Sequence, residues 1–330
     1  MESAVTLDDI LAARGRIAGA VETTPTVPSP PLSALCGVPV HLKLEHRQAT
    51  GSFKLRGASN AVALLSPEER QQGVVAASTG NHGRALAQAA ARAGMRATIC
   101  MSRLVPGNKV AEIGRLGAEA RIVGDSQDDA QEEADRLAAQ GMAMVPPFDH
   151  PAVVAGQGTL GLEIVEAVPD AALVLVPLSG GGLAAGVAAA VKALRPKTRV
   201  VGVSMARGAA MKASLDAGRP VLVEEVPTLA DSLGGGIGLA NRLTFAMCRD
   251  LLDGVVLLSE DEIAAGIRHA YAQEREIVEG AGAVGIAALL AGKVEPDGPT
   301  VAVLSGCNID MALHRRVVCG GGSSARERAA

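Results

Sequence analysis

Residues 49–58 of the chain are Ala-Thr-Gly-Ser-Phe-Lys-Leu-Arg-Gly-Ala. They follow an alternating segment, 38–44, that predicts a strand, and they lead into the alanine- and leucine-rich segment 58–65, which predicts a helix. Ser52 can cap the first turn of that helix, so we expect Lys54 close to a helix amino terminus. Burial among apolar neighbours and the positive end of the helix dipole both lower the pKa of a lysine. A lysine in a turn is more often solvated and inert, so covalent chemistry at Lys54 requires a cofactor site elsewhere in the chain.

Length and composition restrict the class of protein. With 330 residues the chain has room for two domains around separate cores. Hydrophobic residues make up 48% of the chain but aromatic residues only 1%, so surfaces for stacking nucleic-acid bases are nearly absent. The formal net charge of −4 also argues against a nucleic-acid partner.

Cysteine usage and the apolar segments indicate a cytoplasmic protein. The five cysteines are widely spaced and form no Cys-x-x-Cys pair, a pattern typical of reduced thiols. The first ten residues include acidic residues where a secretory signal would be basic and then apolar. The most apolar segment, 171–191, contains a proline and four glycines, which favours strand, turn and helix over a membrane span. We therefore expect no membrane partner.

The order of predicted elements indicates an α/β fold. Segment 73–147 alternates predicted strands (74–77, 97–101, 120–123, 142–145) with predicted helices (84–93, 108–116, 125–140). The same alternation restarts at 151. We predict two domains, each a mostly parallel sheet flanked by helices: 1–72 with 148–320 as the larger, cofactor-binding domain, and 73–147 as the smaller, substrate-carboxylate domain. The proline-rich segment 25–31 is predicted to be a crossing connection that breaks the regular structure. The tail 321–330 is predicted to be disordered.

A glycine turn at 179–183, Ser-Gly-Gly-Gly-Leu, lies between an apolar strand and an alanine-rich helix. Successive backbone N–H groups at such a helix start can hold a phosphate. A dinucleotide site is the competing interpretation, but the next strand ends in Val203-Ser204-Met205, without the acidic residue that would bind a ribose. A turn that is glycine-rich only for tight packing is the other alternative.

Polar residues follow two further predicted strands. Ser78-Thr79-Gly80-Asn81-His82 stands at a strand end and a helix start, where hydroxyl and N–H groups can hold a carboxylate. Ser305 follows the last strand, and Glu279 precedes a glycine- and alanine-rich helix. Each of these also has a plain structural explanation, as turn composition or as an acid favoured by a helix dipole.

Four ordered motifs carry a resemblance to a known family: Thr-Gly-Ser-Phe-Lys-Leu-Arg-Gly, Ser-Thr-Gly-Asn-His-Gly, Ser-Gly-Gly-Gly-Leu and Leu-Ser-Gly-Cys-Asn. Together they resemble the pyridoxal-phosphate enzymes of fold type II, within them the threonine dehydratase and serine racemase group. Glu-His-Arg-Gln at 45–48 and Gly-Val-Ser-Met at 202–205 look like the hydroxyectoine-utilisation dehydratase branch.

The resemblance implies a role for each motif residue. Lys54 would form the Schiff base with pyridoxal 5'-phosphate, and Phe53 would pack on its ring. Asn81 would bind the ring hydroxyl, and Ser305 would face the pyridine nitrogen. The residues implied to bind the phosphate are Gly180, Gly181, Gly182 and Leu183. The residues implied to hold the substrate carboxylate are Ser78, Thr79, Gly80, Asn81 and His82. Glu279 would lie beside the substrate. Two departures matter: Thr79 stands where serine racemases have a serine base, and Ser204 and Ala210 stand where some relatives have acidic metal ligands, so no metal is expected.

The resemblance and the chemistry together predict a dehydratase (ammonia-lyase) that eliminates water from a β-hydroxy-α-amino acid. A neutral hydroxyl at the pyridine nitrogen makes the cofactor a weaker electron sink, which favours loss of a β-leaving group over reprotonation. Lys54 would take the α-proton, with Thr79 and Glu279 as further catalytic candidates. Threonine, serine and a hydroxylated ectoine-derived amino acid share the reacting atoms. A racemase or β-replacement enzyme, a non-catalytic binding protein and, third, a nicotinamide oxidoreductase are the alternatives, and the resemblance implies a homodimer.

Overall fold

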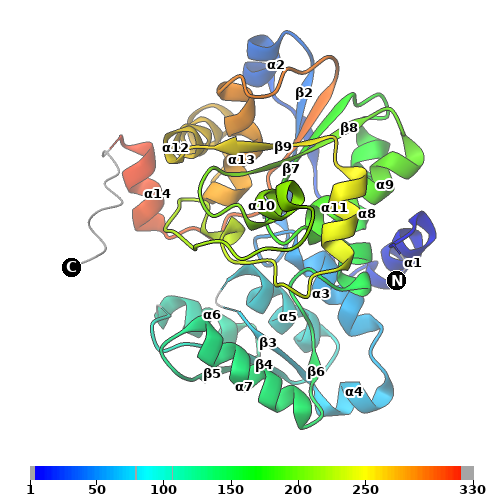
Figure 1. Ribbon diagram of the computed structural model, residues 1–330, viewed down its shortest axis with the longest axis vertical. Coiled ribbons are helices and arrows are strands. Elements are labelled where there is room, and N and C mark those ends of the chain that lie inside the picture. Colours follow the sequence, from blue (N-terminus) through cyan, green and yellow to red (C-terminus); the bar gives the residue numbers. More distant parts are fainter. Residues whose placement is uncertain (1–3, 79, 106, 321–330) are drawn as a thin grey trace.

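The computed structural model describes residues 4–78, 80–105 and 107–320 and contains two sheets (Figure 1). The larger sheet has the strand order β1-β2-β10-β7-β8-β9. Its strands are β1 (Thr26–Pro28), β2 (Val40–Lys43), β7 (Leu173–Pro177), β8 (Arg199–Met205), β9 (Gly254–Leu258) and β10 (Thr300–Val303). All neighbours pair in parallel except β1, which runs antiparallel to β2. Thr79 and the tail 321–330 lie outside the described residues.

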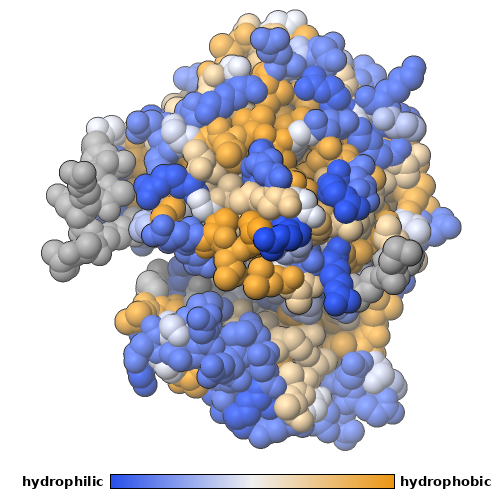
Figure 2. All heavy atoms as spheres, viewed as in Figure 1, coloured by the Kyte–Doolittle hydropathy of each residue, from blue (hydrophilic) through white to orange (hydrophobic). Residues whose placement is uncertain are grey.

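The smaller sheet has the order β5-β4-β3-β6, with every pair parallel. Its strands are β3 (Val74–Ala77), β4 (Ala97–Met101), β5 (Glu119–Ile122) and β6 (Ala143–Met144), and the helices between them are α5 (Asn81–Arg92), α6 (Gly107–Arg115) and α7 (Gln127–Ala139). Four strands and three helices therefore alternate as predicted, and the α/β class is confirmed. The surface over α6 and α7 is largely hydrophilic, as expected for helices with one face in solvent (Figure 2).

The remaining helices are α1 (Leu7–Ile17), α2 (Pro30–Cys36), α3 (Lys54–Ala63), α4 (Pro67–Gln72), α8 (Pro151–Ala167), α9 (Gly182–Leu194), α10 (Ala210–Ala217), α11 (Leu243–Leu251), α12 (Glu260–His269), α13 (Gly280–Leu290) and α14 (Met311–Val318). Short helical turns are η1 (Glu45–Arg47), η2 (Asp231–Leu233) and η3 (Ala270–Glu274). The expectation for 25–31 is wrong, since this segment holds β1 and the start of α2. Ser29 caps α2, and prolines at the first helical positions suit a helix start.

Helix α3 packs between the two sheets, because it contacts both α5 of the smaller unit and α8 of the larger one. Leu55, Ala58 and Val62 of α3 belong to the same apolar cluster as the strands of the smaller sheet. Two other apolar clusters cover the two faces of the larger sheet. The division at 73 and 147 stays a prediction, supported by sheets that share no strand, and Lys54 begins the helix that lies between them.

Helices α8 and α9 approach closely at glycines, which gives a stability prediction. A Cβ added to Gly186 would lie 2.4 Å from the Val154 carbonyl oxygen and 2.6 Å from the Gly158 nitrogen. We expect Gly186→Ala to lower the free energy of unfolding by about 1–3 kcal/mol. Gly15→Ala is the control, because nothing lies within 4 Å of a Cβ at this position in α1. That change should raise stability by about 0.4–1 kcal/mol in the same urea titration, and equal effects of the two changes would contradict the argument.

No helix in the described ranges is long and apolar enough to cross a bilayer. The five cysteines, all within those ranges, are free thiols.

Candidate active site

Lys54 is the first residue of α3, and its amine is enclosed. The Nζ atom donates to the Pro147 carbonyl at 2.7 Å and lies 5.4 Å from the centre of the Phe53 ring. Burial lowers the pKa of Lys54 from 10.5 to about 8. A substantial fraction of the amine is therefore neutral near physiological pH, as the sequence-based argument from burial requires.

The predicted cap of α3 by Ser52 is wrong. Phe53 occupies the N-cap position without a side-chain hydrogen bond, and the buried Ser52 hydroxyl has no partner among the described residues. Instead the Phe53 N–H donates to the Ser305 carbonyl at 3.0 Å, and Ser52 forms an isolated bridge with Gly306. The chain leading to Lys54 is thus held by the segment that follows β10.

Asn81 and Glu279 form the polar centre of the site. The Asn81 Nδ2 atom donates to Glu279 Oε1 at 2.8 Å, and Asn308 Nδ2 donates to Asn81 Oδ1 at 2.5 Å. Burial, and then the charge of Asp231, raise the pKa of Glu279 from 4.5 to about 7, against the hydrogen bond from Asn81. The Glu279 carboxyl can therefore both hold and release a proton near neutral pH.

Two strand ends and the start of α13 meet at this pair. The Glu279 N–H donates to the Gly306 carbonyl at 3.1 Å, and the buried Ser305 hydroxyl donates to the Ala281 carbonyl at 3.5 Å. A Cβ on Gly306 would come within 2.7 Å of Glu279 Oε1 and 3.4 Å of Asn81 Nδ2. Asn81, Glu279 and Ser305 come from distant parts of the sequence, and the fold brings them together.

The side chains of Ser78 and His82 are occupied by the protein itself. Ser78 Oγ accepts the N–H groups of Gly83 at 3.0 Å and Gly80 at 3.4 Å. His82 Nε2 lies 2.7 Å from the Val145 carbonyl oxygen, and burial, with a smaller contribution from Lys54, lowers the pKa of His82 to about 3. If 78–82 holds a carboxylate, the donors are backbone N–H groups at the start of α5 rather than these two side chains.

The glycine turn at 180–183 combines close packing with free donors. Gly181 has a φ of 90°, in the left-handed region, and a Cβ there would lie 2.8 Å from Met211 Cε and 3.0 Å from Cys248 Sγ. A Cβ on Gly180 would lie 2.3 Å from Phe148 Cδ1. Within the described chain no acceptor takes the N–H groups of 180–183, which form the start of α9. Packing explains the glycines, and the free N–H groups suit an anion.

The predicted domain boundary falls at 147/148, yet the segment 146–149 connects Lys54 to the glycine turn. The Pro147 carbonyl accepts a hydrogen bond from the Lys54 amine, and the Phe148 ring packs on Gly180. Asp149 Oδ1 accepts the N–H of Thr244 at 2.8 Å, and the Thr244 hydroxyl lies 2.8 Å from the Gly180 carbonyl oxygen. One signal pointed here: Phe148 is among only three phenylalanines in the chain.

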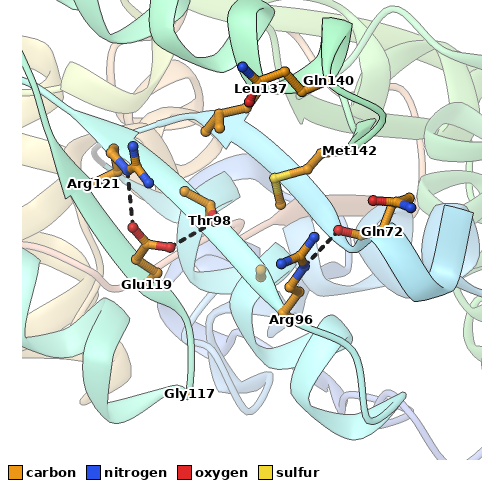
Figure 3. Close-up of a pocket in the computed structure, with 10 residues that line it drawn as sticks. Gln72, Arg96, Thr98, Gly117, Glu119, Arg121, Leu137, Gln140 and Met142 are labelled. Atoms are coloured by element: carbon orange, nitrogen blue, oxygen red, sulfur yellow. Dashed lines mark hydrogen bonds and ion pairs between the residues drawn. The ribbon is translucent and has the colours of Figure 1, made fainter.

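Two cavities distinguish the ends of the smaller sheet. A cavity of about 90 Å³ at the carboxyl end is lined by Gly80, Asn81, Arg84, Lys109, Asp231, Ser232 and Asn308. A larger one, about 300 Å³, lies at the amino ends of β4, β5 and β6, lined by Arg96, Thr98, Glu119, Arg121 and Met142 among others (Figure 3). Its Glu119 already pairs with Arg121 at 3.0 Å. Ligands of parallel sheets bind at the carboxyl ends, so the smaller cavity, beside Asn81, is the candidate site.

The residues present fit pyridoxal phosphate. An enclosed amine with a lowered pKa suits its aldehyde, and the free N–H groups of 180–183 suit its phosphate. The buried Ser305 hydroxyl is a neutral partner for a pyridine nitrogen. The described residues contain no group of three His, Cys, Asp or Glu side chains that could hold a metal ion.

Comparison with known proteins agrees with this fit. A Sinorhizobium fredii protein named "Putative threonine dehydratase" is 67% identical over 320 residues, 96% of each chain. The structure of processed threonine deaminase isoform 2 from Solanum lycopersicum aligns with a TM-score of 0.89 and 37% identity, covering 96% of this chain and 88% of that one. Maize serine racemase aligns with a TM-score of 0.90 and 31% identity, over 97% and 98%. The family model described as pyridoxal-phosphate dependent enzyme matches residues 17–306, and the chain therefore belongs to this family, in its fold type II, with pyridoxal phosphate as cofactor.

Proposed function

We propose that the protein is a dehydratase (ammonia-lyase) that removes water from a β-hydroxy-α-amino acid. The observation that carries the proposal is that the chain supplies two buried groups of opposite role: an enclosed amine with a pKa of about 8, and a carboxyl with a pKa of about 7. The similar proteins named threonine dehydratase or threonine deaminase support it. Threonine and serine are the simplest candidate substrates, and a hydroxylated ectoine-derived amino acid is the third.

Lys54 would supply the base. When bound, pyridoxal phosphate supplies an electron-withdrawing ring that acidifies the α-proton of an attached amino acid. Once the Lys54 amine is free, its lowered pKa leaves enough of it neutral to accept that proton at Nζ. The Pro147 carbonyl, 2.7 Å from Nζ, orients the amine.

Glu279 would supply the acid. A hydroxyl is a poor leaving group unless it is protonated as it departs, and a carboxyl that still holds its proton near pH 7 can provide that proton. Asn81 fixes the orientation of the carboxyl through its hydrogen bond to Oε1. The N–H groups at the start of α5 would hold the substrate carboxylate.

Two measurements test the proposal. The protein supplied with pyridoxal phosphate should develop an absorption band at about 410–420 nm that borohydride abolishes. A panel of threonine, serine, 3-hydroxyaspartate and hydroxylated diaminobutyrate should then give 2-oxo acid and ammonia from at least one member. A protein that binds the cofactor but releases no 2-oxo acid from any of them would instead be a racemase, a β-replacement enzyme or a binding protein.

Racemisation is the second candidate, favoured by the likeness to maize serine racemase. It requires a base on each face of the substrate, and Thr79, outside the described residues, stands at the expected place of the second base. Chiral analysis of amino acid recovered from deuterated water separates the two reactions, since only a racemase returns the opposite enantiomer with deuterium at Cα. The homodimer and the cytoplasmic location stay predictions.

The glycine turn gives a prediction about cofactor affinity. In Gly181→Ala a Cβ must fit between Met211 and Cys248 in left-handed backbone, which displaces the N–H groups of 180–183. We expect the dissociation constant for pyridoxal phosphate, measured by absorbance titration, to rise at least about tenfold. Gly37→Ala is the matched control, because Gly37 also has a left-handed φ of 70° but nothing lies within 4 Å of its Cβ position. Equal affinities in both variants would refute the role of the turn.

A further inference from the structure

Two residues beyond Lys54, the side chain of Arg56 enters a buried cluster of four charges. Its members are Lys43 of β2, Glu45 of η1, Arg56 of α3 and Glu163 of α8, a set that we term the buried tetrad. The side chains of Lys43 and Arg56 are each 1% exposed, that of Glu45 is 0% exposed and that of Glu163 is 10% exposed. Charges are rarely buried to this extent unless each has partners, so the contacts of the tetrad need an explanation.

The guanidinium of Arg56 binds both carboxylates of the tetrad. Its Nε and Nη2 atoms donate to the two oxygens of Glu45 at 2.8 and 2.7 Å. Its Nη1 and Nη2 atoms donate to the two oxygens of Glu163 at 2.6 and 2.9 Å. The first turn of α3 is therefore fastened to η1 on one side and to α8 on the other by paired hydrogen bonds.

Lys43 closes the tetrad. Its Nζ atom donates to Glu163 Oε2 at 2.5 Å and to the Thr24 carbonyl at 2.6 Å, while the Thr24 hydroxyl donates to Glu45 at 2.5 Å. Burial opposes the charge on Arg56, but Glu45 and Glu163 more than offset it and raise the pKa of Arg56 above its usual value. The pKa of Glu45 is lowered, since Arg56 outweighs the effect of burial. Two cations thus face two anions, and the tetrad has no net charge.

The start of α3 depends on these contacts because it has no side-chain cap. The tetrad supplies the attachment that a cap would otherwise give, at the turn that carries Lys54. We propose that the buried tetrad is a positioning network for Lys54, which fixes the first turn of α3 and leaves no net charge on the contacts that hold this turn. The proposal rests on the role of Lys54 given above, and Arg56 acts in it only through Lys54.

The surroundings of the amine agree with this assignment. Three titratable groups stand on the neighbouring elements: His82 on α5, Asp149 on the segment 146–149 and Glu279 before α13. His82 is neutral near pH 7. The Asp149 carboxylate accepts hydrogen bonds from the N–H groups of Arg242 and Thr244. Burial alone lowers the pKa of Lys54, with no contribution from a neighbouring charge. In a medium of low dielectric constant, a single unbalanced charge in the tetrad would act on the amine over several ångströms.

The test changes the charge of the tetrad by one unit in each direction. Arg56→Met leaves a net charge of −1, Glu163→Gln leaves +1, and the double variant R56M/E163Q leaves zero. Cofactor-free protein is labelled with acetic anhydride across a range of pH, and the labelling of Lys54 is followed by peptide mass spectrometry with Lys192 and Lys212 as internal references. The pH at which labelling of Lys54 is half complete should rise by about half a pH unit or more in Arg56→Met and fall by a similar amount in Glu163→Gln. In the double variant this midpoint should return towards the parent value.

Matched variants keep the result interpretable. Arg14→Met and Glu166→Gln break the exposed pair between α1 and α8 and should leave the midpoint unchanged. Arg56→Lys keeps the charge but loses the paired hydrogen bonds, so it should keep the midpoint and weaken pyridoxal phosphate binding at least about tenfold. If Arg56→Met does not fold, Lys43→Met gives the same net charge with the contacts of Arg56 intact.

Shifts of the same sign in the oppositely charged variants, or no shift in folded protein, would overturn the proposal. So would tight cofactor binding by Arg56→Lys. These outcomes differ from a failure of the proposed function, because labelling of Lys54 in cofactor-free protein does not require turnover of any substrate.

Discussion

Lys54→Ala is expected to lower the turnover of a β-hydroxy-α-amino acid by at least about 10³-fold and to abolish the absorption band formed with pyridoxal phosphate. The reason is that one amine serves two purposes, as the attachment point of the cofactor and as the base that takes the α-proton. Lys54 fits both purposes, because its amine is enclosed at the start of α3 and burial lowers its pKa to about 8. The measurements are the release of 2-oxo acid and the visible spectrum.

The same change should not unfold the cofactor-free protein. Because the pKa of Lys54 is lower in the folded state, the unfolded chain binds the proton more tightly. The parent protein therefore loses stability as the pH falls from 10.5 to about 8, and the full loss is present below about pH 8. Lys54→Ala removes that loss. The free energy of unfolding of the variant, measured in urea, should therefore exceed that of the parent most near pH 7, and the difference should shrink as the pH rises from 8 to 10.5. Lys212→Ala, on the surface of α10, is the control for turnover. Full turnover by Lys54→Ala would exclude the proposed chemistry.

Local patterns predicted most of the fold, because periodicity and capping act over a few residues. The alternation from Val74 to Met144 contains buried runs separated by amphipathic helices, and the Thr6 and Ser126 side chains cap α1 and α7. Prediction failed where the signal was short or contradictory. Prolines at 28, 30 and 31 concealed an edge strand and a helix start, although a proline is tolerated in both places.

The candidate site was predictable at the strand ends and not in the tertiary contacts. Lys54, Asn81, Glu279 and Ser305 each stand next to a recognisable local motif, so the sequence indicates them singly. The Pro147 carbonyl that holds the Lys54 amine is a backbone atom, which carries no residue signature. The buried tetrad joins residues up to 120 positions apart, and in the sequence each of them looks like an ordinary surface charge.

Glu279→Gln should show the second large effect, in the pH dependence of stability. The pKa of Glu279 is raised from 4.5 to about 7, so between these values the folded protein binds the proton more tightly than the unfolded chain does. The parent therefore loses stability as the pH rises through this window, and the full loss is present above about pH 7. Glutamine keeps an acceptor for Asn81 and does not ionise. The stability of Glu279→Gln relative to the parent should be near zero below pH 4.5 and reach about 3 kcal/mol by pH 8.

Urea unfolding of cofactor-free protein at several pH values measures this difference, and other titrating groups cancel because they are common to both proteins. Glu132→Gln, on the exposed face of α7, should give a flat difference over the same range. In turnover, Glu279→Gln should lose about 10²–10⁴-fold while keeping the cofactor band, because it removes the proton donor to the departing hydroxyl and leaves Lys54 in place. A pH-dependent stability gain with unchanged turnover would show that Glu279 is a buried acid without a catalytic role, and the phosphate of the cofactor would then be the remaining source of that proton.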